Sequence, residues 1–253
     1  MSRLSRAFRP GTLVCYLTAG YPSYEKSIDY VMACVEGGAD VIELGVPFTD
    51  PVADGKVIQM ASQVALEQGM TPSRVLRFAS EIRSRTEVPL VLMGYYNPIF
   101  VVGEAEFAER AAEAGVDGLI VPDLPVEECS SLRQQCQRRS MDLVQLVAPT
   151  TPEERMAKIA RRSSGFLYVV SSMGTTGERV DLDDRVGALV ARAKQAAGPL
   201  PVGVGFGVST PQQVRSLRDH DADGVIVGSA LLRKVASGES PRGLESYVRS
   251  LKG

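Results

Sequence analysis

Short apolar runs alternate along this chain with longer, charged segments in which apolar residues recur at helical spacing. The short runs are rich in β-branched residues and predict strands, whereas the longer segments predict helices. We count eight such strand and helix units. The predicted strands are 13–17, 41–44, 90–93, 118–121, 142–146, 166–170, 202–204 and 224–227. The predicted helices are 24–36, 57–67, 73–85, 104–114, 127–138, 152–162, 185–196, 211–218 and 244–251, with a short one at 229–234.

The position of the polar segments predicts how these units are assembled. Small turns such as 114–117 lead into strands, whereas segments rich in polar residues, Gly and Pro follow them. Eight parallel strands with such segments at their carboxyl ends predict an α/β fold, a single (β/α)8 TIM barrel whose site lies on that face. With no Pro, Ser or Gly-rich linker, we expect one domain over 1–253. A doubly wound sheet would alternate similarly, but 203–207 lacks the G-x-G-x-x-G spacing of dinucleotide-binding sheets.

Composition narrows the class of protein. With 253 residues, 44% of them hydrophobic, the chain can bury an ample core. A net charge of -2 without a basic, aromatic-rich run argues against nucleic acid as a partner. The basic N-terminus lacks the apolar stretch of a secretory signal, and eighteen apolar residues never run together. We therefore expect a soluble, cytoplasmic protein without a membrane segment.

The cysteines and the single histidine carry no recognisable chemistry. Cys15, Cys34, Cys129 and Cys136 lack CxxC or Cys/His ligand spacing, so we expect reduced structural thiols and no metal site. His220 lies in a polar turn before a strand, on the face opposite the predicted site. We expect it to take no part in catalysis.

A carboxylate interrupts the apolar run 41–47 and is the strongest functional candidate. Alternation in a strand sends Ile42 and Leu44 to one face and Glu43 to the other, into a core. An unpaired buried carboxylate is costly, so the acid is either used in chemistry or paired with a barrel Lys or Arg. Burial should raise its pKa toward neutrality. Asp54 lies in the loop that follows and should remain ionised, either as a second catalytic acid or as an ordinary turn residue before Gly55.

Glycines after the last three strands predict an anion site. Segments 174–177, 205–207 and 228–230 can present backbone N–H groups, and 229–234 supplies a short helix N-terminus. Barrels often bind phosphate at this position. The competing interpretation is that these glycines only make tight turns.

At this point the motifs resemble a known family. The run 43–55, Glu-Leu-Gly-Val-Pro-Phe-Thr-Asp-Pro-Val-Ala-Asp-Gly, closely resembles the signature of the tryptophan synthase alpha chain family, indole-3-glycerol-phosphate lyases. Agreement continues in order through 17–22, 95–98, 122–125, 174–177 and 205–208. The resemblance spans nearly the whole chain. Two positions depart from the usual pattern, Lys56 for proline and Thr175 for valine, and both bear on loop ordering.

The resemblance implies retro-aldol cleavage of indole-3-glycerol phosphate to indole and glyceraldehyde 3-phosphate. Glu43 would transfer protons, and Asp54 would accept the indole N–H hydrogen bond. Tyr168 would place its hydroxyl near the reacting carbon, with a core tyrosine as the alternative. The remaining expected contacts are Gly177, Gly207, Gly228 and Ser229 for the phosphate and Tyr95, Thr176 and Phe206 for the substrate pocket.

The resemblance also implies a partner. In the family a pyridoxal-phosphate-dependent beta chain receives the indole, so we expect an alpha2-beta2 heterotetramer in tryptophan biosynthesis, with no cofactor and no metal in this chain. The loops at Asp54 and at 171–178 would act as lids that exclude water.

Three other functions remain open from the residues. A free-standing indole-3-glycerol-phosphate lyase that releases indole would share every catalytic residue. A non-catalytic phosphate-binding barrel could regulate a partner, although retention of Glu43 and Asp54 argues against it. An isomerase or synthase acting on another phosphorylated substrate would leave indole-3-glycerol phosphate unconsumed.

Overall fold

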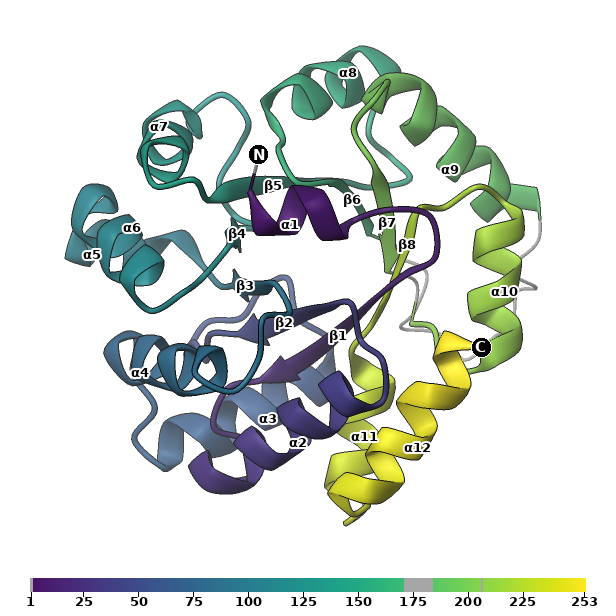
Figure 1. Cartoon of the computed structure of the whole chain (residues 1–253). Coiled ribbons are helices and arrows are strands. Elements are labelled where there is room, and N and C mark those ends of the chain that lie inside the picture. The colour runs from purple at the N-terminus through teal and green to yellow at the C-terminus, as the bar shows by residue number, and fades with distance from the viewer. Residues whose placement is uncertain (1, 171–183, 206) are drawn as a thin grey trace.

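The computed structural model describes residues 2–170, 184–205 and 207–253, with the side chains of 184 and 185 excepted. Its strands form a closed, all-parallel barrel in the order β1 to β8, which confirms the predicted (β/α)8 fold and excludes an open doubly wound sheet (Figure 1). The strands are β1 Thr12–Thr18, β2 Val41–Gly45, β3 Leu90–Met93, β4 Gly118–Ile120, β5 Asp142–Val147, β6 Leu167–Val170, β7 Val202–Gly205 and β8 Gly224–Val227. All eight lie within two residues of the predicted bounds.

Helices surround the barrel and cover its outer face (Figure 1). They are α1 Arg3–Ala7, α2 Tyr24–Glu36, α3 Lys56–Glu67, α4 Pro72–Arg83, α5 Tyr96–Val102, α6 Glu104–Glu113, α7 Ser130–Arg138, α8 Glu153–Arg162, α9 Asp184–Ala197, α10 Pro211–Asp219, α11 Ser229–Ala236 and α12 Pro241–Lys252. Every predicted helix is present. The sequence prediction missed α1 and α5, which have only 5 and 7 residues and are too short to show a clear helical period.

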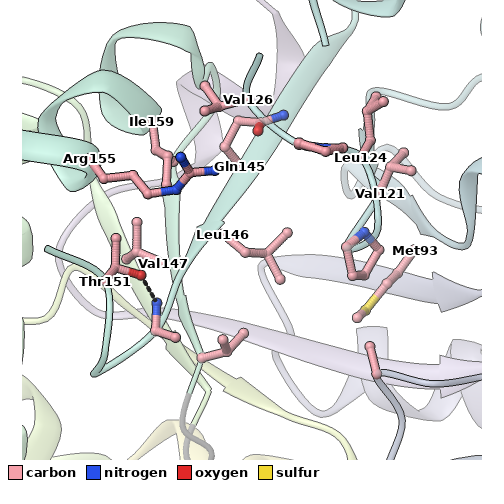
Figure 2. A pocket seen from close by; sticks show the side chains of 15 residues that line it. Met93, Val121, Leu124, Val126, Gln145, Leu146, Val147, Thr151, Arg155 and Ile159 are labelled. Atoms are coloured by element: carbon pink, nitrogen blue, oxygen red, sulfur yellow. Dashed lines mark hydrogen bonds between the residues drawn. The ribbon is translucent and has the colours of Figure 1, made fainter. Parts of the chain in front are cut away.

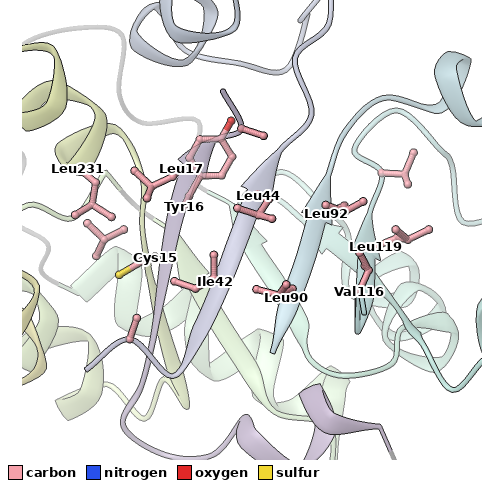
Figure 3. Close-up of a cluster of buried hydrophobic side chains, with 14 of the residues drawn as sticks. Cys15, Tyr16, Leu17, Ile42, Leu44, Leu90, Leu92, Val116, Leu119 and Leu231 are labelled. Carbon is pink, nitrogen blue, oxygen red and sulfur yellow. The ribbon is translucent and has the colours of Figure 1, made fainter. Parts of the chain in front are cut away.

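Alternation along the strands separates two apolar cores. Ile42 and Leu44 on β2 face the helices, together with Leu90 and Leu92 on β3 (Figure 3). Most strands contribute inward-facing side chains that fill the barrel interior. These side chains are Val14, Val41, Val91, Ile120, Val144, Phe166, Tyr168 and Ile226. Because the outer faces of the strands are largely apolar, the helices can pack on them while the inner face is left for the site.

Helix α1 lies across the amino-terminal end of the barrel (Figure 1). Its Leu4 belongs to the interior core, and Phe8, just after the helix, stacks on Phe166 with ring centroids 4.2 Å apart. A Cβ at Gly224 would lie 2.4 Å from the Phe8 ring, so glycine is required there. This end of the barrel is therefore closed, and a ligand can enter only from the carboxyl ends of the strands.

The state of the cysteines agrees with the expectation from the sequence. All four cysteines are buried free thiols. No helix in the described part of the chain is long and apolar enough to span a membrane. Closure of the barrel by the first and last strands supports our proposal that 1–253 is a single domain.

Candidate active site

Glu43 lies at the centre of β2 and faces the barrel interior, as alternation predicted. Its exposed fraction is 1%, and both carboxylate oxygens lack a hydrogen-bond partner among the described residues. No lysine or arginine in those residues pairs with it, which argues against a structural ion pair. Burial, with a smaller contribution from the charge of Asp54, raises the pKa of Glu43 to about 8. The side chain is therefore a neutral acid at pH 7.

Asp54 lies in the loop between β2 and α3 and is half-buried. Burial raises its pKa to about 6, and the nearby Tyr95 hydroxyl opposes this shift by donating toward the carboxylate. We expected this carboxylate to remain ionised. The structure keeps it mostly ionised at pH 7 but brings its titration close to neutrality, because the loop folds inward over the end of the barrel.

The two acids open onto one cavity of about 210 Å³ at the carboxyl end of the barrel. Tyr168 from β6 lines the same cavity, and so do Gly207, Gly228 and Ser229. The other lining residues are Tyr16, Ala53, Ile58, Met93, Val170, Gly205 and Ile226. Six of the predicted site residues, which are far apart in sequence, therefore line one cavity.

Tyr168 projects from β6 into this cavity. Its hydroxyl makes no hydrogen bond to the backbone of the described residues, and a Cβ on Gly205 of β7 would lie 2.8 Å from it. Burial and the neighbouring Glu43 raise the pKa of Tyr168 well above its usual value. The phenol is thus held neutral beside Glu43, an arrangement that favours a role at the site over a purely structural one.

Glycines and a helix N-terminus also line this cavity. Gly207 has φ +66, a conformation that favours glycine. Gly228 precedes α11, which has no side-chain cap, so its first N–H groups are free to bind a ligand. Free N–H groups and the helix dipole together suit an anion. Gly177 of the predicted phosphate site lies outside the described residues.

Of the three residues predicted for the substrate pocket, the structure describes only Tyr95. Thr176 and Phe206, like Thr175, lie outside the described residues. Tyr95 does not line the carboxylate cavity. Instead it stacks on Phe48 at 5.1 Å and lies behind the Asp54 loop. Its position therefore suits support of the loop rather than direct contact with a ring.

Sequence reasoning missed several lining residues, of which Tyr16 is the most informative. It pairs with Glu43 across β1 and β2, and its ring is fully buried. Alternation from Val14 would have placed it on the inward face. The apolar residues Met93, Val170 and Ile226 carried no signal that separated them from core positions, because apolar residues line both the core and the cavity.

A second, larger cavity of about 460 Å³ adjoins the first and contains neither acid (Figure 2). The two share Ala53, Met93 and Val170. Within the described ranges, no group of three or more His, Cys, Asp or Glu side chains is placed to hold a metal ion. That this chain works without a metal or a cofactor stays a prediction from the sequence.

A closed barrel with two acids and a glycine-rich helix N-terminus at its carboxyl end is typical of enzymes that act on small phosphorylated substrates. The model of the family described as "Tryptophan synthase alpha chain" matches residues 4–252. A tryptophan synthase alpha chain of Prochlorococcus marinus is 50% identical over 238 residues, 93% of this chain and 86% of the relative. One from Methanosarcina barkeri is 47% identical over 248 residues, 98% and 92% of the two chains.

Solved structures give the same result. A chain from the tryptophan synthase α2β2 complex of Pyrococcus furiosus is similar with a TM-score of 0.91 and 39% identity, covering 96% of this chain and 98% of that chain. A structure from Aquifex aeolicus has a TM-score of 0.90 and 37% identity, with 100% and 98% covered. The chain belongs to the tryptophan synthase alpha chain family, as the sequence motifs predicted.

Proposed function

We propose that this chain is the alpha subunit of a tryptophan synthase, a carbon-carbon lyase that cleaves indole-3-glycerol phosphate to indole and glyceraldehyde 3-phosphate. The observation that carries the proposal is the shared cavity. Glu43 and Asp54 open onto one space that Gly207, Gly228 and Ser229 also line. An apolar ring that carries a phosphorylated tail fits such a division between acids and free N–H groups.

The cavity suggests how the substrate lies. The phosphate would bind the N–H groups at Gly207, Gly228 and Ser229, with Gly177 as a further contact. The glycerol carbons would then reach Glu43, and the indole N–H would donate to Asp54. Thr176 and Phe206 would complete the substrate pocket, and Tyr95 would support the Asp54 loop through its hydrogen bond from Ala53.

The protonation states support a specific order of proton transfers. Because the pKa of Glu43 is raised to about 8, its neutral carboxyl can donate a proton to indole C3. Positive charge then develops on the ring, and the Asp54 carboxylate stabilises it through the indole N–H. The Glu43 carboxylate next takes the proton of the adjacent hydroxyl, the bond to C3 breaks, and the electron pair returns to the ring. Indole and an aldehyde leave, and Glu43 regains its starting proton.

Tyr168 has a supporting role in this proposal. Its phenol is neutral, buried and close enough to Glu43 for the carboxyl charge to affect its pKa. A neutral hydroxyl can hold the substrate hydroxyl in line or stabilise the Glu43 carboxylate that forms midway. It need not change its own protonation state.

The proposal includes a beta chain as the partner, in an alpha2-beta2 assembly. The similar chain from Pyrococcus furiosus belongs to an α2β2 complex with mutual activation. In this chain, exposed apolar side chains follow β2 and β3 at the carboxyl end of the barrel, where Val52, Phe100 and Val101 have exposed fractions of 85%, 67% and 75%. Side chains of this kind suit a protein interface beside the site. A location in the cytoplasm is also part of the proposal, in keeping with four unpaired thiols.

Incubation of the purified chain with indole-3-glycerol phosphate tests the proposal. We expect indole and glyceraldehyde 3-phosphate in equal amounts, and faster release when a beta chain is added. Turnover that the beta chain leaves unchanged would favour a free-standing lyase over a subunit. Failure to consume the substrate in either condition would reject the proposed reaction.

A further inference from the structure

The larger cavity has more room than the indole ring needs. Its volume is about 460 Å³, and it joins the carboxylate cavity along Ala53, Met93 and Val170. A cavity of about 150 Å³ is enough for a benzene molecule. The larger cavity can therefore hold an aromatic ring together with a substituent on that ring.

Strand β4 is shorter than its neighbour β5, which leaves an opening in the barrel wall beside the larger cavity. Strand β4 ends at Ile120, opposite Val144, whereas β5 continues to Val147, so the last residues of β5 have no partner on β4. Leu146 faces the barrel interior, and Gln145 faces the other way, yet both line the cavity (Figure 2). The cavity thus passes from the interior, over the end of β4, to the space beside α8.

Gln145 gives this space a polar group that lines the cavity wall. Its exposed fraction is only 4%, and within 2–170, 184–205 and 207–253 its side-chain amide forms no hydrogen bond, although its backbone N–H donates to Ser163. The side chain extends toward the wall that contains Val126 (Figure 2). An amide on a cavity wall can both donate a hydrogen bond to a ligand and accept one from it.

The charges around the cavity favour a neutral ligand group. Arg155 also lines it, but both of its terminal nitrogens bind Glu127, at 2.9 and 3.0 Å. Lys158 donates to the same carboxylate at 2.9 Å. Both terminal nitrogens of Arg155 are therefore already occupied by Glu127, and the polar group left for a ligand is the neutral Gln145 amide. A hydroxyl group that can both donate to and accept from the Gln145 amide fits better than a carboxylate.

The bound substrate would direct its six-membered ring toward the larger cavity, and this orientation rests on the proposed function. Gly207 and Ser229, which would bind the phosphate, line only the carboxylate cavity, whereas Met93 and Val170 line both cavities. With the indole N–H on Asp54 and C3 beside Glu43, the six-membered ring is the part left to face Met93 and the opening beyond.

We infer that this chain binds and cleaves indole-3-glycerol phosphates that carry a hydroxyl on the six-membered ring, with Gln145 as the residue that recognises the hydroxyl. The bond changes are those of the unsubstituted substrate. The C3 carbon gains a proton, the adjacent side-chain hydroxyl loses one, and the bond between them breaks to give a hydroxyindole and glyceraldehyde 3-phosphate.

The test compares kcat/KM for three kinds of substrate, namely the unsubstituted compound, its 5- and 6-hydroxy derivatives and the 5- and 6-methyl derivatives of similar size. We expect at least one hydroxy derivative to be cleaved about tenfold better than the methyl derivative at the same position, the effect of one hydrogen bond to a buried group. Gln145→Met, which keeps the length but removes the amide, should abolish this ratio and leave cleavage of the unsubstituted compound unchanged.

Two further variants make the result specific. Gln145→Glu keeps a polar group and should retain part of the preference, which separates recognition from a packing defect. Gln134→Leu on the exposed side of α7 is the matched control and should change nothing. The inference would be overturned if hydroxy and methyl derivatives were cleaved at equal rates, or if the ratio survived Gln145→Met. In either case, normal cleavage of the unsubstituted compound would still uphold the proposed function. Failure to cleave the unsubstituted compound would overturn both.

Discussion

The hydroxyl of Tyr95 accepts a hydrogen bond of 2.9 Å from the backbone N–H of Ala53. This contact connects the end of β3 to the loop that carries Asp54, one residue along. The same hydroxyl partly opposes the rise that burial causes in the pKa of Asp54. One side chain therefore both positions the second acid and favours its ionised form.

Replacing Tyr95 with Phe should impair catalysis without unfolding the barrel. We expect kcat/KM to fall about tenfold, the effect of losing a hydrogen bond at the Asp54 loop. The acidic limb of the pH profile should also move to higher pH, since the opposing effect on the Asp54 pKa is lost. Tyr96→Phe is the control, because that hydroxyl bonds Glu104 at 2.9 Å on the outside of the barrel. Equal effects of the two variants would contradict the role of Tyr95.

The wild-type pH profile of kcat/KM should be bell-shaped. Activity should rise as pH passes about 6, where Asp54 ionises, and fall above about 8, where Glu43 loses the proton that it must donate. The charge of Asp54 contributes to the raised pKa of Glu43, so ionisation of the first acid affects the second. Asp54→Asn should remove the acidic limb and shift the basic limb to lower pH, because the charge that raises the Glu43 pKa is gone. A profile that stays flat through both values would reject the assignment.

Glu43→Gln should abolish activity but stabilise the fold at high pH. We expect turnover to fall at least about a hundredfold, since the variant keeps the size but cannot exchange a proton. The folded pKa of Glu43, about 8, lies above its ordinary value of 4.5, so the folded state holds this proton more tightly. Wild-type stability should therefore be greatest below the lower value and fall by up to roughly 1 kcal/mol per pH unit between the two.

Denaturant unfolding of wild type and Glu43→Gln at pH 5 and pH 9 checks the sign of this effect. The variant should gain stability relative to wild type as pH rises. If the difference between the two proteins is the same at both pH values, Glu43 is not a buried acid with a raised pKa.

Gly228→Ala should weaken binding of the phosphate end. An added Cβ would lie 3.2 Å from the Tyr16 ring, tight enough to displace the start of α11. We expect KM to rise about tenfold and inhibition by glycerol 3-phosphate to weaken in parallel, with a smaller effect on kcat. Ser237→Ala, at the other end of α11, removes only a bond to the Lys234 carbonyl and serves as the control. Unchanged inhibition would move the phosphate site elsewhere.

Much of this fold was predictable from local patterns. The alternation in β2 correctly turned Glu43 inward, and Tyr168 shares the inner core with Phe166, as its spacing indicated. Helix α1 could not be predicted because its stability comes from packing of Leu4 into the barrel interior, a contact that local sequence does not show.

The site was predictable in its charged and glycine residues but not in its apolar walls. Tyr16 and Met93 line the cavity, yet their local sequence does not differ from that of core strands. The role of Tyr95 also depended on tertiary structure, because its contact with Ala53 joins residues 42 positions apart. Likewise, the opening beside β5 results from unequal strand lengths, which no motif encodes.

A crystal structure of the Glu43→Gln variant with bound indole-3-glycerol phosphate tests the central claim most directly. We predict one ligand whose indole nitrogen lies within hydrogen-bond distance of the Asp54 carboxylate, whose C3 contacts residue 43, and whose phosphate lies at the N-terminus of α11. A ligand that reaches only one of the two acidic positions, or that binds outside their shared cavity, would contradict it.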